Sequence, residues 1–70
     1  MAFITVTDKT GGFTRHISAE HVMEVRGESE GSVVSMALPG QAGTVRYHVR
    51  EPVQDIVGRV ETALAYRLHG

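Results

Sequence analysis

The sequence predicts an α+β fold: a five-stranded antiparallel meander, forming a curled sheet or small barrel, with one C-terminal helix packed on it. Three observations support this prediction. Residues 45–50 alternate between apolar and polar side chains, which is the period of a strand that buries one face. After Pro52 the apolar residues recur every three or four positions, as on one face of a helix. Glycine-containing turns divide the preceding chain into short segments.

The strands are expected, in chain order, at residues 3–7, 13–17, 22–26, 32–38 and 45–50. The first two form a hairpin around Gly11-Gly12, because glycine adopts positive φ without a steric penalty. In the second strand, Phe13 and Ile17 are expected to face the core and Arg15 to lie at an edge. Residues 18–21 break the alternation and predict a tight turn or one short helical turn. Two further turns, at residues 27–31 and 39–43, separate the last three strands.

The helix is predicted to begin at Pro52, whose fixed φ and missing N–H suit a first helical turn. Its apolar stripe consists of Val53, Ile56, Val57, Val60 and Leu64. Gly58 lies within the helix, where glycine costs about 1 kcal/mol relative to alanine. We therefore expect a close approach at Gly58, either of the sheet or of a second subunit. The apolar pattern continues through Tyr66 and Leu68, further than one buried face requires.

The length of 70 residues predicts a single domain, residues 1–70. A chain this short buries only about 60% of the surface that its unfolded form exposes. It has no cysteine, so neither a disulfide nor a cysteine zinc site can stabilise it. Small domains without these features often oligomerise. We expect a homodimer, and the candidate interface residues are Ile4 and Val6 in the first strand and Gly58, Tyr66 and Leu68 in the helix.

Composition also bounds the partners and the location. The net charge is −1, whereas domains that bind nucleic acid non-specifically are usually strongly basic. The longest apolar runs are too short to span a membrane. The first residues lack a basic segment followed by an apolar core, so we expect no secretory signal. The expected location is the cytoplasm, with protein partners and no membrane.

The residues with catalytic or metal-binding chemistry do not form a recognisable motif. His16, Glu20, His21 and Glu24 lie within nine residues, but a zinc site needs three or four convergent ligands and nothing in the spacing forces convergence. The simpler interpretation is that both histidines are exposed. Ser18 lies near both histidines in the sequence, yet no oxyanion hole is indicated. The sequence therefore predicts no enzyme, no metal site and no cofactor.

One basic stripe remains as a candidate site. Arg46, His48 and Arg50 lie two residues apart, so their side chains share one strand face over about 13 Å. Arginine is suited to bidentate phosphate contacts, so this face is a candidate for binding anions or nucleic acid. The alternative is a solvated face paired with cross-strand partners such as Glu24. No aromatic residue interleaves with the stripe to stack on bases.

Several segments resemble small flagellar proteins of the FlbD type over roughly residues 3–64. The matching segments are ITVT, the turn glycine Gly12, HISAEHVMEV, SVVSMAL and YHVREPVQDIVGRV. The last contains the family's motif as Tyr47, Val49, Glu51, Val53 and Ile56. The resemblance implies the same succession of strands followed by a helix.

Two further families are similar in outline. DNA-binding LytTR domains are similar up to the fifth strand and the start of the helix. The RNA-binding regulator CsrA also has five strands followed by a helix, and Arg50-Glu51 resembles its strand–helix junction. An arginine of that family contacts RNA there, which implies the same candidate role for Arg50. The leading hypothesis is nevertheless a small non-enzymatic protein–protein interaction module that forms a homodimer. The alternative is a nucleic-acid-binding regulator that uses the basic stripe.

Overall fold

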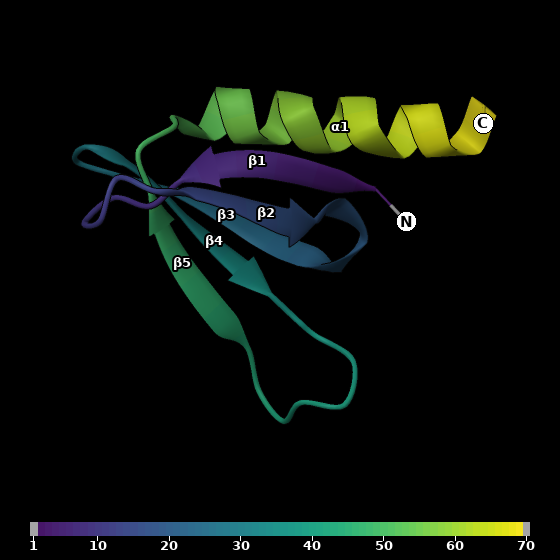
Figure 1. Cartoon of the computed structure of the whole chain (residues 1–70), viewed down its shortest axis with the longest axis horizontal. Helices are drawn as coiled ribbons and strands as arrows, with labels where there is room; N and C mark the ends of the chain where they lie inside the picture. The colour runs from purple at the N-terminus through teal and green to yellow at the C-terminus, as the bar shows by residue number, and fades with distance from the viewer. Residues whose placement is uncertain (1, 70) are drawn as a thin grey trace.

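The computed structural model describes residues 2–69, and the side chains of residues 2–66. The elements are β1 (Phe3–Thr7), β2 (Thr14–Ser18), the short 3-10 helix η1 (Ala19–His21), β3 (Val22–Glu28), β4 (Gly31–Met36), β5 (Val45–Val49) and α1 (Val53–His69). Helix α1 lies along β1 at one border of the molecule, and its last turns extend past the strands (Figure 1). The α+β class, the five antiparallel strands and the C-terminal helix are thereby confirmed.

The strands form two sheets, with the orders β1-β2 and β3-β4-β5. The expectation of one continuous meander or a closed barrel is wrong in this respect. The reason is η1, which turns the chain between β2 and β3 so that these two strands do not pair. A single antiparallel bridge between Asp8 and Val49 connects the sheets in the described residues, supported by the hydrogen bond from Arg50 N–H to Thr7 O at 3.0 Å.

The turn between β3 and β4 shows why one glycine is required. Gly31 has a φ of 114°, which side chains other than glycine rarely adopt. A Cβ atom at this position would also collide with the carbonyl oxygen of Val49. Glycine therefore allows the start of β4 to pass close to the end of β5, where the bridge to β1 forms.

The core lies between the two sheets and beneath α1. It consists of Ile4, Val6, Ile17, Ala19, Val34, Met36, Val49 and Ile56. Strand β1 buries every second residue, as its alternation predicts. Strand β4 is buried on both faces, and its central position places residues of β3 and β5 on either side of its side chains.

The second strand differs from its expected pattern. Phe13 precedes β2 and is 51% exposed, so the prediction that it faces the core is wrong. The strand begins at Thr14, and the alternation therefore does not include Phe13. The guanidinium of Arg15 lies 4.8 Å from the centroid of the Phe13 ring and 4.6 Å from that of the Tyr47 ring. Arg15 also bonds Asp8 of its own hairpin at 3.2 Å, while its contact with Tyr47 on β5 connects the two sheets. Strand β2 is an edge strand of its sheet, in agreement with the edge position expected for Arg15.

Helix α1 buries a narrower stripe than the sequence predicts. Ile56 is fully buried, and Val60 and Leu64 are partly buried against the core. Val57 is 38% exposed, so its assignment to the buried stripe is wrong. No heavy atom lies within 4 Å of a Cβ built on Gly58, which excludes a close approach of the sheet as the reason for this glycine. A second subunit near Gly58 stays a prediction.

The first testable prediction concerns the helix–sheet core. Ile56→Ala leaves a cavity beneath α1 and should lower the free energy of unfolding by roughly 2–5 kcal/mol. Val57→Ala is the matched control, because Val57 lies on the same helix and is partly exposed. Chemical denaturation measures both variants. Equal midpoints for Ile56→Ala and the parent chain would show that α1 does not pack as described.

Candidate interaction groove

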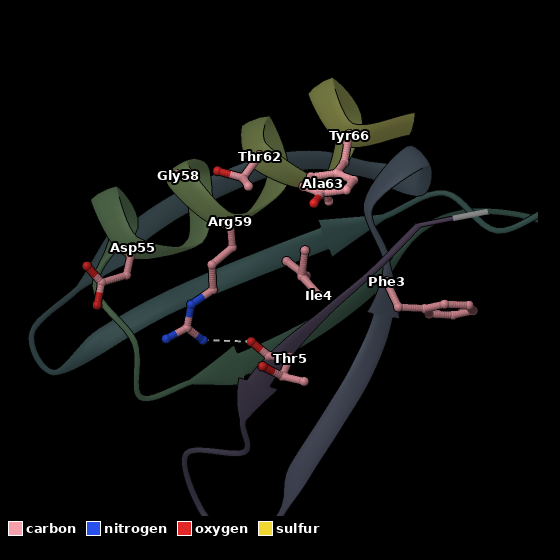
Figure 2. A pocket seen from close by; sticks show the side chains of 9 residues that line it. All are labelled: Phe3, Ile4, Thr5, Asp55, Gly58, Arg59, Thr62, Ala63 and Tyr66. Carbon is pink, nitrogen blue, oxygen red and sulfur yellow. Dashed lines mark hydrogen bonds between the residues drawn. The ribbon is translucent and has the colours of Figure 1, made fainter. Parts of the chain in front are cut away.

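An open groove of about 870 Å³ lies between β1 and α1 (Figure 2). It is lined by Phe3, Ile4 and Thr5 from β1 and by Asp55, Gly58, Arg59, Thr62, Ala63 and Tyr66 from α1. The α1 residues are spaced by three or four positions, so most of them share a second face of the helix, beside the face that packs on the core. One helix therefore both covers the core and forms a wall of the groove.

The edge of β1 that faces α1 is identified by its pairing with β2. Asp8 N–H donates to Phe13 O across the hairpin, at 2.8 Å. In an antiparallel pair the backbone groups of successive residues point alternately toward and away from the partner strand. The N–H and C=O groups of Phe3, Thr5 and Thr7 consequently point away from β2.

Side chains occupy the C-terminal part of this edge. Thr7 N–H and Thr7 Oγ1 donate to the two carboxylate oxygens of Glu51, at 2.9 and 2.8 Å. Arg59 Nη1 donates to Thr5 O at 2.7 Å, the bond drawn in Figure 2, and lies 3.6 Å from Glu51 Oε2. Within the described residues, Phe3 N–H, Phe3 C=O and Thr5 N–H have no hydrogen-bond partner. The N-terminal part of the edge is therefore unpaired and faces the groove.

Glu51 is ionised in a half-enclosed position, with its side chain 14% exposed. Burial raises the pKa of this carboxyl, but the hydrogen bonds from Thr7 and the charge of Arg59 outweigh burial. The net result is a pKa below the usual range for glutamate. The carboxylate is thus more stable in the folded chain than in the unfolded chain.

The second prediction follows from this depressed pKa. Ionised Glu51 stabilises the fold above its unfolded-state pKa of about 4.3, and the stabilisation is lost as the pH falls through the folded-state pKa. Glu51→Gln should lower the free energy of unfolding at neutral pH by on the order of 1–3 kcal/mol. The difference in unfolding free energy between Glu51→Gln and the parent chain should become smaller below about pH 4. All other carboxyl groups are common to both chains and therefore do not contribute to this difference. Denaturation between pH 7 and pH 3 measures the difference, and a constant difference would contradict this role for Glu51.

Three of the five interface residues predicted from the sequence meet in this groove: Ile4, Gly58 and Tyr66. The side chain of Ile4 is nevertheless almost fully buried in the chain's own core. Val6 is buried in the same core and does not line the groove, so its side chain cannot contact a partner. The side chain of Leu68 lies outside the described ones.

The sequence interpretation missed other groove residues. Phe3 is 56% exposed, and a large aromatic side chain on the face opposite Ile4 was a readable signal of an exposed apolar surface. The helix period also places Asp55, Arg59 and Thr62 on one face, beside the buried stripe. The contact between Glu51 and Thr7 spans 44 residues, and no local pattern indicates it.

Arg46 and His48 of the basic stripe are exposed on β5, Arg50 follows the end of the strand, and the stripe is partly neutralised. His48 Nδ1 and Lys9 Nζ both lie 3.1 Å from Glu28, whose pKa is lowered by the hydrogen bond from Lys9 and then by that from His48. Arg50 Nε donates to Lys9 O at 3.4 Å. Arg46 is exposed and makes no ion pair within the described residues. The stripe's acidic partner in the structure is Glu28, on β3, and not the expected Glu24.

The histidines near η1 have a structural arrangement. His21 Nδ1 lies 2.8 Å from Ser18 Oγ, and Ser18 Oγ donates to Glu20 Oε1 at 3.2 Å. Because serine, and not histidine, is the middle group, this arrangement differs from that of a catalytic triad. His16 is exposed on β2. Among the described residues, no cluster of three or more histidine or carboxylate side chains could hold a metal ion.

No protein-family model, curated protein or solved structure matches the chain. The resemblance to FlbD-type proteins and the looser similarities to LytTR and CsrA therefore stay predictions. Within the described residues, the helices are too short or too polar to cross a membrane.

The third prediction tests the basic stripe. Because Glu28 already engages His48, and Arg50 is bonded to the backbone, we expect no measurable binding of single-stranded RNA or duplex DNA near physiological salt. Fluorescence anisotropy with labelled oligonucleotides measures this. A sub-micromolar complex that weakens steeply with salt, and is lost in Arg46→Ala and Arg50→Ala, would make nucleic-acid binding the function instead.

Proposed function

We propose that the chain is a small, non-enzymatic protein–protein interaction module that works as a homodimer. The observation that supports this proposal is a pair of exposed aromatic side chains at the groove between β1 and α1. Phe3 and Tyr66 are 56% and 76% exposed, and both line the groove. Aromatic side chains are enriched at protein interfaces because they combine a large apolar area with few rotatable bonds.

The seam of the dimer is assigned to the C-terminal end of α1. The last turns of this helix extend past the strands, so they can meet a second copy without disturbing the core (Figure 1). Tyr66 lies near the C-terminal end of α1, where it lines the groove together with Phe3, and it can bury its ring while its hydroxyl stays in water. A two-fold arrangement is the commonest closed assembly, and it would bring the two Tyr66 side chains toward one interface.

The strand edge, in contrast, is a poor seam for two copies. Helix α1 lies along the groove-facing edge of β1 in each chain (Figure 1). A second copy that paired its own β1 there would bring its own α1 to the same edge. That second helix would have to occupy space beside β1 that the first chain's own structure already fills. The helix end is therefore favoured over pairing between the two β1 strands.

The fourth prediction concerns self-association. Sedimentation at micromolar concentration should show a species of twice the 7.6 kDa chain mass. Tyr66→Glu should convert it to the monomer, because the substitution places a charge in the seam. Met23→Glu is the matched control, since Met23 is an exposed apolar side chain on β3, in the other layer of the fold. A single species near 7.6 kDa across a hundredfold dilution would exclude the homodimer.

A further inference from the structure

The unpaired part of β1 differs from an ordinary exposed strand edge. Phe3 C=O and Thr5 N–H flank Ile4 and point toward the groove, not toward open solvent. One wall of the groove is formed by α1, as Figure 2 shows. Backbone donors and acceptors at this spacing are complementary to the backbone of another extended chain.

We propose that the groove binds an extended peptide segment of another protein, which pairs with the Phe3–Thr5 edge of β1 and lies against α1. The inference rests on the proposed function, because it names the partner of a protein-binding module. Strand addition beside a helix is an established mode of peptide recognition: main-chain hydrogen bonds supply affinity, and pockets for side chains supply specificity.

A free peptide avoids the steric conflict that a second copy would meet at this edge. A second copy's β1 is joined to its own core and is accompanied by its own α1. An extended segment has no such attached layer and needs only the width of one strand. The groove is shallow and widely open to solvent, so an extended segment can reach it from outside.

The side chains along the groove predict the chemistry of this peptide. Asp55 lies at one end and makes no ion pair within the described residues. Phe3 and Tyr66 lie toward the other end, and both are exposed. Eleven helical positions separate Asp55 from Tyr66, which corresponds to about 16 Å, or about five residues of an extended chain. The peptide should therefore have an aromatic or aliphatic residue beside Phe3 and Tyr66 and a lysine or arginine about four to six positions away. Its backbone pairs with Phe3 and with the N–H of Thr5 only and leaves the edge before Thr5 O, which Arg59 occupies.

Gly58 lies between these two ends and lines the groove. No heavy atom lies within 4 Å of a Cβ built at this position, so the space beside it is open. A leucine here would extend into that space. Leucine also favours helix formation relative to glycine, so Gly58→Leu should not destabilise α1. Loss of peptide binding in Gly58→Leu would therefore result from obstruction of the groove and not from unfolding of the chain.

A second variant tests the strand edge directly. Thr5 N–H faces away from β2, so proline at position 5 removes a groove-facing donor without breaking the β1–β2 ladder. Thr5→Val is the matched control, because it keeps the N–H and the β-branched shape. Denaturation midpoints of all variants establish that each one folds.

The experiment is a phage-display selection of random twelve-residue peptides against the parent chain, with Gly58→Leu as the counter-selection target. We expect enriched peptides with the basic and apolar residues at the stated spacing. Synthetic versions should bind Gly58→Leu and Thr5→Pro at least about tenfold more weakly than the parent, and Thr5→Val equally well. New protection of the Thr5 amide in the complex would confirm strand pairing.

The inference is overturned if no peptide is enriched over Gly58→Leu, or if the enriched peptides bind Gly58→Leu and Thr5→Pro as tightly as the parent. Enrichment of sequences that copy a segment of this chain would also overturn it, because the occupant would then be a second copy. Because Tyr66 lines the groove and also belongs to the proposed seam, peptide binding is measured below the concentration at which the chain dimerises, and the sedimentation of Tyr66→Glu is measured without peptide. The proposed homodimer can therefore stand when the peptide site fails.

Discussion

The carboxylate of Glu51 holds the arrangement on which the rest of the structure depends. Glu51 lies between β5 and α1, and it accepts hydrogen bonds from the backbone and the hydroxyl of Thr7 on β1. Its own carbonyl oxygen accepts a 2.7 Å hydrogen bond from Ser32 Oγ on β4, and Arg59 lies on its other side. One residue therefore connects strands of both sheets with the start of α1. The direction of α1 relative to β1 follows from this contact together with the burial of Ile56.

The groove is a consequence of that geometry. Helix α1 packs Ile56 and Val60 on the core, and the neighbouring helix face then faces the edge of β1. Glu51 and Arg59 satisfy the C-terminal part of this edge, whereas Phe3 and Thr5 retain unpaired backbone groups within the described residues. Proteins usually cover or charge such edges, because an open edge pairs with other chains. Because Glu51 and Arg59 close only the C-terminal part of the β1 edge, another chain can pair only with its N-terminal part.

Local patterns in the sequence account for much of the fold. The alternation in β1 and β5 and the helical period after Pro52 have short-range causes, and they identify these elements with nearly the right bounds. The division into two sheets could not be read in this way, because the pairing of β2 with β3 depends on the path through η1 and not on either strand's alternation. The sequence did indicate Tyr66, because the apolar pattern continues further than one buried helix face requires, and Gly58, because glycine is unfavourable within a helix. The contact of Glu51 with β1 was not, since it joins residues far apart in the chain.

The state of the β1 edge is most directly measured by amide hydrogen exchange at single residues, observed by NMR at low concentration. We expect slow exchange at Ile4 and Val6, whose amides point toward β2, and fast exchange at Thr5, whose amide faces the open groove. Exchange at Thr5 as slow as at Ile4 would contradict an open edge, because the edge would then already be paired and could not receive another chain.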